Sequence, residues 1–215
     1  MYQAVIYDLD GTLADTLGDI ATCMNRVLGW HGSPGYDVAA YRYLVGNGMR
    51  VLCERALGDA ARDATLLDRV EEEMRAEYGA HNCDNTGPYA GIPELLETLT
   101  DRGLGQAVLS NKPQAQTEDM VHRLFGTERF ALVRGQVAGI PLKPDPTSLL
   151  QIAADLGLPV ESCLMVGDTS VDMETARRAG LASVGVLWGF REEEELRASG
   201  AGAIIAAPEE LLQQL

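Results

Sequence analysis

Carboxylates occur in two short polar motifs, and each motif directly follows an apolar run. Asp8 and Asp10 lie in Asp-Leu-Asp-Gly-Thr after the first run, and Asp168 and Asp172 lie in Gly-Asp-Thr-Ser-Val-Asp after a later one. Carboxylates brought together repel one another unless a divalent cation lies among them. Oxygen ligands without supporting histidine favour Mg²⁺. We therefore expect a magnesium site.

A hydroxyl, an amide and two ammonium groups accompany these carboxylates. Ser110 and Asn111 follow another apolar run, and Lys143 lies in Lys-Pro-Asp-Pro. Of the 17 basic residues only Lys112 and Lys143 are lysines, which points to positions that need a compact ammonium rather than the planar fork of arginine. Each motif alone also fits a turn, a helix cap or a surface segment. Their combination indicates an active site.

The elements that must bring these residues together are short apolar strands alternating with helices. We predict strands at 4–7, 106–109, 131–133, 163–166, 183–186 and 203–205, and helices at 93–102, 114–125, 146–156, 170–179, 192–198 and 208–214. This alternation is typical of an α/β fold with a Rossmann-like parallel sheet covered on both faces. Ligands of such sheets bind beyond the carboxyl ends of the strands, where all the motifs would meet.

Residues 15–88 interrupt this alternation. Apolar residues recur there at helical spacing, with breaks at glycine-containing turns, and no strand is predicted. Thr16 is placed to cap the first of these helices. We therefore predict a core of residues 1–14 and 89–215 and an inserted helical cap of residues 15–88. The two connections between them are expected to act as a hinge.

Composition excludes several classes of protein. The chain has 215 residues, a formal net charge of −15, 46% hydrophobic and 23% charged residues, and so enough apolar side chains for a sizeable core. Its acidity argues against nucleic acid or an anionic membrane as a partner, and no apolar run approaches the length of a membrane span. Four scattered cysteines predict neither a disulfide framework nor zinc, and favour the cytoplasm. The sequence leaves the oligomeric state open.

Four motifs together carry a resemblance to a known family. They are residues 8–16 (DLDGTLADT), 109–113 (LSNKP), 143–146 (KPDP) and 167–172 (GDTSVD). In this order they resemble the haloacid dehalogenase-like phosphatases, and the resemblance covers essentially the whole chain, including the cap. With the cap segment 45–50, they resemble the phosphoglycolate phosphatase branch in particular.

The resemblance implies that Asp8 is a nucleophile that forms an aspartyl-phosphate, a chemistry that divides one difficult hydrolysis into two steps. Asp10 would protonate the leaving group and later activate water, which requires its pKa to be raised by burial or neighbours. Lys143 and Ser110 would assist by stabilising the phosphoryl oxygens.

The resemblance also implies a set of metal ligands. Asp8, the backbone carbonyl of Asp10 and Asp168 would hold Mg²⁺, with Asp172 one layer further from the ion.

Other functions share part of this pattern. A true dehalogenase lacks the second aspartate, which is Asp10 here, and a phosphonatase would use a cap lysine, which residues 15–88 do not contain. A small sugar phosphate phosphatase or a β-phosphoglucomutase has the same core. A phospho-accepting regulatory domain or a phosphate-binding protein without turnover is the non-enzymatic alternative.

The expected partner is a small phosphorylated metabolite, and phosphoglycolate is the substrate that the resemblance favours. We expect Thr12, Asn111 and Arg50 to contact it. Arg50 begins a predicted helix after Gly-Asn-Gly, where a guanidinium and backbone N–H groups could bind the carboxylate of phosphoglycolate. Asn47 would suit a sugar hydroxyl instead.

Overall fold

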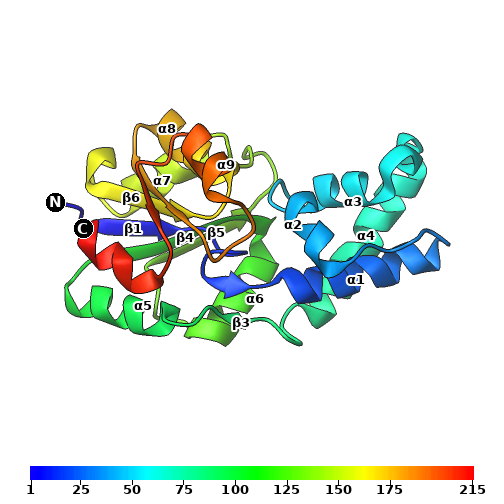
Figure 1. Cartoon of the computed structure of the whole chain (residues 1–215), viewed down its shortest axis with the longest axis horizontal. Helices are drawn as coiled ribbons and strands as arrows, with labels where there is room; N and C mark the ends of the chain where they lie inside the picture. The colour runs from blue at the N-terminus through cyan, green and yellow to red at the C-terminus, as the bar shows by residue number, and fades with distance from the viewer.

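The computed structural model describes residues 1–215 and has a six-stranded, all-parallel sheet at its centre (Figure 1). The strand order is β5-β4-β1-β6-β7-β8. The strands are β1 (Ala4–Tyr7), β4 (Gly105–Pro113), β5 (Leu132–Gln136), β6 (Cys163–Gly167), β7 (Ala182–Val186) and β8 (Ala203–Ile205). The predicted α/β class with a parallel sheet is confirmed.

Both faces of the sheet are covered, because successive residues of each strand point to opposite sides. Ala4 and Ile6 of β1 pack in one apolar cluster with α7 (Thr147–Asp155) and α8 (Ser170–Ala179). Val5 and Tyr7 pack in the other, with α5 (Ile92–Asp101) and α6 (Gln114–Phe125). The helix α9 (Glu193–Ala198) and the 3₁₀ helices η3 (Val160–Ser162) and η4 (Pro208–Gln213) complete this part.

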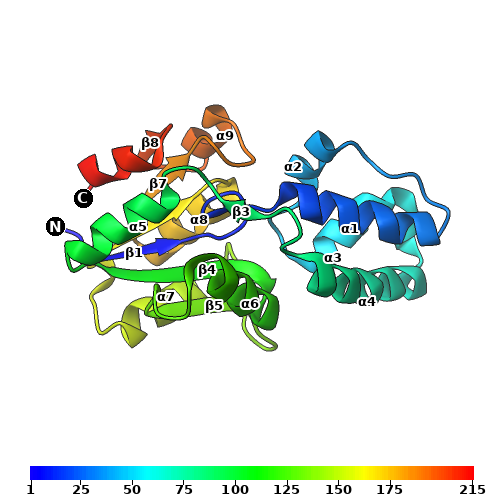
Figure 2. The same cartoon turned by 90° about the horizontal axis from the view of Figure 1, so that it is seen from below.

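A second lobe, built from helices, lies beyond the carboxyl ends of the strands (Figures 1 and 2). Its helices pack on one another around a buried core that is continuous with one of the two sheet clusters. They are α1 (Leu17–Trp30), α2 (Tyr41–Leu44), α3 (Met49–Leu57) and α4 (Ala64–His81), with η1 (Val38–Ala40) and η2 (Gly58–Arg62).

Two short strands correct the expectation that residues 15–88 hold no strand. The chain enters the helical lobe through β2 (Ala14–Asp15) and leaves it through β3 (Gly87–Pro88), and the two pair antiparallel. A contact of two residues between segments far apart in the sequence leaves no periodic pattern. Just beyond the pair, the buried carboxylate of Asp19 accepts hydrogen bonds from Asn85 and Thr86, which ties the two connections together.

Three local expectations were wrong. β4 is longer than predicted and continues through Ser110 to Pro113, because Pro113 still pairs with β5 after a register shift. The last predicted helix is the 3₁₀ helix η4. Thr16 precedes α1 but makes no side-chain cap, and its buried hydroxyl has no hydrogen-bond partner.

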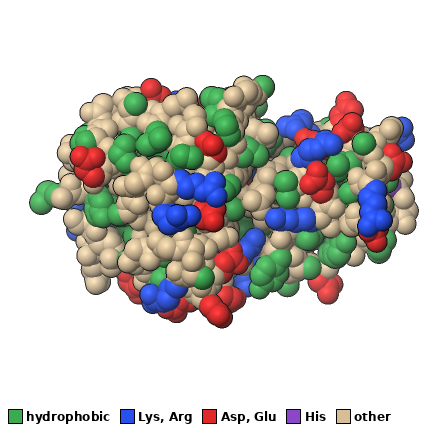
Figure 3. All heavy atoms as spheres, turned by 90° about the horizontal axis from the view of Figure 1, so that it is seen from above, with side chains coloured by type: hydrophobic (Ala, Val, Ile, Leu, Met, Phe, Trp, Pro, Cys, Tyr) green, Lys and Arg blue, Asp and Glu red, His purple; other side chains and the backbone are tan.

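The surface mixes charges of both signs. Acidic residues outnumber basic ones by 32 to 17, yet on the face drawn in Figure 3 Lys and Arg are interspersed with Asp and Glu. None of the helices combines the length and the apolar character needed to span a membrane.

Candidate active site

The strand register brings the two acidic motifs side by side. Tyr7 at the end of β1 pairs with Val166 of β6 on one side and with Val108 of β4 on the other. Asp8 and Asp168 therefore leave neighbouring strands at the same edge of the sheet. Asp8, Asp168 and Asp172 lie there as one buried group, with a carboxylate oxygen of each within 4.8 Å of the others.

Lys143 neutralises part of this group. Its ammonium donates hydrogen bonds to Asp8 Oδ1 at 2.8 Å, to Asp172 Oδ1 at 2.6 Å and to the carbonyl of Leu109 at 3.0 Å. Burial alone would lower the pKa of Lys143, but the carboxylates of Asp172 and Asp8 outweigh it and raise that pKa. Lys143 is thus a permanent cation against the proposed nucleophile.

Asp172 is held by the first turn of its own helix. Its Oδ2 accepts hydrogen bonds from the backbone N–H and the hydroxyl of Thr169, and the first of these bonds belongs to the capping box at the start of α8. Gly167 leaves room for it, since a Cβ there would lie 2.4 Å from the Asp172 side chain. Asp172 therefore presents only Oδ1 to Lys143.

Asp168 is fully buried and fixed from two sides. Its Oδ1 accepts a hydrogen bond from the hydroxyl of Thr12 at 3.1 Å, and its Oδ2 accepts one from the N–H of Phe190 at 2.8 Å. Gly11, at φ +89°, passes so close that a Cβ would lie 2.3 Å from Asp168 Oδ2. Thr12, expected to contact substrate, is fully buried and orients Asp168 instead.

The charges of this group fit a divalent cation. Burial raises the pKa of Asp8 to about 7, with Asp172 and Asp10 adding to the effect and Lys143 opposing it. Burial also raises the pKa of Asp168 well above its usual value, reinforced by Asp8 and Asp172. Three carboxylates face one ammonium, so a divalent oxygen-seeking cation such as Mg²⁺ would supply the missing positive charge.

We expect EDTA to abolish turnover and Asp168→Ala to weaken Mg²⁺ binding more than Asp172→Ala does. Asp172 Oδ1 accepts a hydrogen bond from the Lys143 ammonium, a cation that would compete with a metal ion, whereas the oxygens of Asp168 accept hydrogen bonds only from neutral donors. Thermal-shift titration with MgCl₂ measures binding in each variant, alongside the Mg²⁺ dependence of the rate. Equal weakening in both variants would contradict this ranking.

Ser110 and Asn111 have different tasks. The hydroxyl of Ser110 lines a cavity between this site and the helical lobe and accepts a hydrogen bond from the N–H of Lys112, so its own O–H can donate to a ligand. Asn111, expected to contact substrate, uses all its polar atoms within the protein. Its amide holds both backbone groups of Lys143 and donates to the carbonyl of Gly46 in the helical lobe.

Asp10 and Lys112 form an ion pair beside this group. The carboxylate of Asp10 is 20% exposed and contacts the ammonium of Lys112. The expectation was a more deeply buried side chain, as suits a carboxyl group that donates a proton. Asp10 is not one of the clustered carboxylates, so only its backbone carbonyl remains as the expected ligand. Lys112 also donates to the hydroxyl of Tyr78 at 2.9 Å. The sequence pointed to Lys112 only by the rarity of lysine, and nothing marked Tyr78 apart from core residues.

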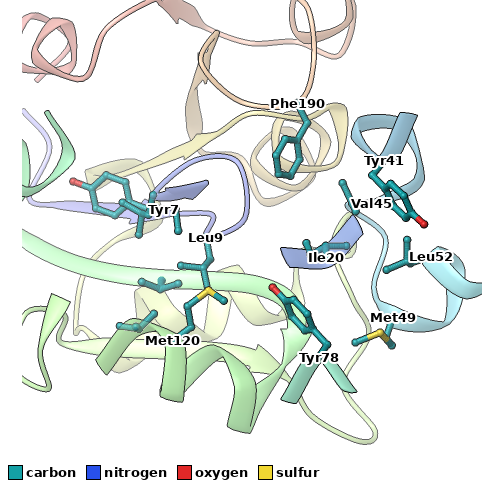
Figure 4. Packing of buried hydrophobic residues seen from close by; sticks show 14 of the residues in the cluster. Tyr7, Leu9, Ile20, Tyr41, Val45, Met49, Leu52, Tyr78, Met120 and Phe190 are labelled. Atoms are coloured by element: carbon teal, nitrogen blue, oxygen red, sulfur yellow. The ribbon is translucent and has the colours of Figure 1, made fainter. Parts of the chain in front are cut away.

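A cavity that opens to solvent lies between this site and the helical lobe. The sheet side contributes polar groups, including Asp8, Asp10, Ser110 and Lys112. Apart from the hydroxyl of Tyr78, the side chains on the helical side are apolar. They are Ile20, Val45, Met49, Leu52, Met74 and Tyr78. Figure 4 shows Ile20 and Val45 between the helical lobe and Phe190 of the core.

Arg50 does not lie in this cavity. Its guanidinium lies on the surface of the helical lobe, half-exposed, 2.8 Å from Asp68 and 2.9 Å from Glu71. Asn47 accepts a hydrogen bond from Arg55. The structure therefore does not support the expectation that Arg50 binds substrate, because its guanidinium is held by two carboxylates of α4 and does not line the cavity.

The parallel sheet and a buried carboxylate–lysine group at its edge define an α/β enzyme. The family model described as haloacid dehalogenase-like hydrolase matches residues 5–186. The chain belongs to this family, and it is one of its phosphatases.

Relatives with assigned activities match over most of the chain. An N-acetylmuramic acid 6-phosphate phosphatase of Pseudomonas aeruginosa is 33% identical over 99% of this chain and 94% of its own length. A phosphoglycolate phosphatase of Aquifex aeolicus is 34% identical over 87% of this chain and 86% of its own length. The crystal structure of a predicted phosphoglycolate phosphatase from Haemophilus somnus has a TM-score of 0.91 at 26% identity, covering 99% of this chain and 97% of the other.

Proposed function

We propose that this phosphatase is Mg²⁺-dependent, works through an aspartyl-phosphate on Asp8 and acts on phosphoglycolate. The observation that carries the mechanism is the buried contact between Lys143 and Asp8, which lines the cavity. Asp8 lines the space where a phosphoryl group would bind, and the ammonium of Lys143 donates a hydrogen bond to its carboxylate. The same group would suit a nucleophile that must approach an anion.

In the first step an oxygen of Asp8 forms a bond to phosphorus while the bond between phosphorus and the ester oxygen breaks. Asp10, which lines the same cavity, donates a proton to the departing alkoxide. In the second step Asp10 takes a proton from water, and the water oxygen attacks the phosphorus and releases Asp8. Lys143 and the Ser110 hydroxyl stabilise the phosphoryl oxygens, and Mg²⁺, when bound by Asp8 and Asp168, supplies further positive charge.

Two observations support phosphoglycolate as the substrate. Its CH₂ group would lie against the apolar side of the cavity, and relatives at 30–34% identity are named phosphoglycolate phosphatases. A sugar phosphate would need polar partners for several hydroxyls, and the helical side of the cavity offers few. The test is kcat/KM on a panel of phosphoglycolate, hexose phosphates and pyrophosphate, with phosphoglycolate preferred. A uniform rate across the panel would contradict this substrate.

N-acetylmuramic acid 6-phosphate is a second candidate. The relative from Pseudomonas aeruginosa that matches 99% of the chain is named for it. This compound also carries a carboxylate, and its methyl groups could pack against the apolar side chains from the helical lobe. Including it in the panel separates the two candidates directly by the ratio of kcat/KM.

Arg50→Met should leave kcat/KM on phosphoglycolate within about threefold of the wild-type value, because the guanidinium contacts only surface carboxylates. The measurement is steady-state kinetics on the same panel. A tenfold or larger loss confined to phosphoglycolate would show that Arg50 turns into the cavity when substrate binds.

A further inference from the structure

The cavity contains one basic side chain. Lys112 is the only lysine or arginine among the residues that line it, and the helical side contributes no charged group at all. Lys143 lies behind Asp8, where its ammonium is surrounded by two carboxylates and a carbonyl. Any second negative charge on a substrate, apart from the phosphoryl group, therefore has Lys112 as its available cation.

The ammonium of Lys112 is buried and incompletely paired. It contacts Asp10 and the hydroxyl of Tyr78, and its third neighbour is the sulfur of Met120 at 3.8 Å. An ammonium has three donors, and a thioether is a weak acceptor. One N–H of Lys112 thus lacks a strong partner although the side chain is only 4% exposed.

Tyr78 offers a second donor at the same place. Its oxygen accepts the hydrogen bond from Lys112, and its own O–H donates to no group in the protein. Burial, with Asp10 adding, raises the pKa of Tyr78, so the hydroxyl stays protonated. Two donors beside Asp10 match the two oxygens of a carboxylate.

The position of Asp10 shows which part of a substrate meets these donors. In the proposed reaction Asp10 protonates the ester oxygen, so the groups around Asp10 surround the leaving group and not the phosphoryl group. Lys112 belongs to the core and Tyr78 to α4 of the helical lobe, so both parts of the chain contribute to this place.

We propose that Lys112 and Tyr78 form a subsite for a carboxylate on the leaving group, and that this subsite selects carboxylate-bearing phosphomonoesters. The inference rests on the proposed function. Phosphoglycolate satisfies it, because its carboxylate is bonded to the carbon that carries the ester oxygen. In this proposal Lys112 and Tyr78, rather than Arg50, bind the carboxylate of the substrate.

The test compares two esters that differ in one group: phosphoglycolate and 2-hydroxyethyl phosphate, in which a hydroxymethyl group replaces the carboxylate. Lys112→Met should lower kcat/KM on phosphoglycolate about 10- to 100-fold more than on 2-hydroxyethyl phosphate. Tyr78→Phe should give a smaller loss in the same direction, and Lys112→Arg should retain part of the selectivity because it keeps the charge. Met49→Leu exchanges one apolar side chain of the same cavity for another, so it should change kcat/KM on the two esters by the same factor.

Lys112 also contacts Asp10, so the ratio between the two esters carries the test rather than either rate alone. Equal losses on both esters would show that Lys112 only positions Asp10, and would overturn the inference while leaving the proposed function intact. Failure of the wild-type enzyme to hydrolyse either ester with Mg²⁺ would contradict the proposed function instead.

Calorimetry gives a readout that needs no turnover. Binding of both esters is measured with Mg²⁺ in Asp8→Asn and in Asp8→Asn/Lys112→Met. We expect phosphoglycolate to lose about 10- to 100-fold in affinity and 2-hydroxyethyl phosphate to lose much less. The same loss for both esters, or none for either, would overturn the subsite even if neither compound is a good substrate.

Discussion

We expect Asp8→Asn to lower turnover by about 10⁴-fold or more while the chain stays folded. Asparagine keeps the shape of the side chain but cannot form the acyl phosphate. Folding should survive because Asp8 is a desolvated carboxylate close to Asp172, and Lys143 retains Asp172 as its partner. The measurements are steady-state kcat/KM and the melting temperature.

Mass spectrometry of the quenched wild-type reaction tests the intermediate itself. We expect a peptide containing Asp8 to carry one added phosphoryl group, and the Asp8→Asn peptide to carry none. Asp15→Asn, an exposed carboxylate of the same segment, is the matched control. Near-normal activity of Asp8→Asn would exclude the covalent mechanism.

Lys143→Met should reduce turnover by roughly 10³-fold and destabilise the protein by about 3–5 kcal/mol. The substitution removes the cation from between Asp8 and Asp172 and leaves two buried carboxylates without compensation. Lys143→Arg should not restore activity, because a side chain that is 2% exposed has no room for the larger guanidinium fork. Denaturant unfolding and kinetics give the two quantities.

A double variant separates stability from catalysis at this position. Lys143→Met/Asp172→Asn removes the cation together with one of its carboxylates, so much of the lost stability should return. Turnover should stay low, because the cation that supports Asp8 is still absent. Recovery of activity along with stability would mean that Lys143 is structural and that another group neutralises the phosphoryl oxygens.

The order of the motifs was enough to predict the α/β class, because apolar runs alternate with helical patterns and each run ends in a polar motif. It was also enough to place Asp8, Asp168 and Lys143 at one edge, since parallel strands share that edge. The short pairing of β2 with β3 was missed, because a two-residue contact between distant segments leaves no periodic signal.

The roles of single polar side chains were predicted less well. Thr12 and Asn111 lie near the site, as expected, but their hydrogen bonds go to Asp168 and to the backbone of Lys143. A residue type states which bonds a side chain can make, whereas its rotamer and neighbours decide which bonds it does make. Arg50 shows the same effect more strongly, since Asp68 and Glu71 reach it only after α3 and α4 have packed.

The sequence by itself determined the sheet, the inserted helices and the clustering of carboxylates with a lysine, because these depend on local patterns and on where strands end. Only the tertiary structure decided which cation meets the leaving group. Lys112 contacts Tyr78 across 34 positions of sequence, because the folded chain brings α4 of the helical lobe to the end of β4. The apolar character of the remaining cavity side likewise comes from residues of several helices that converge only in the folded chain.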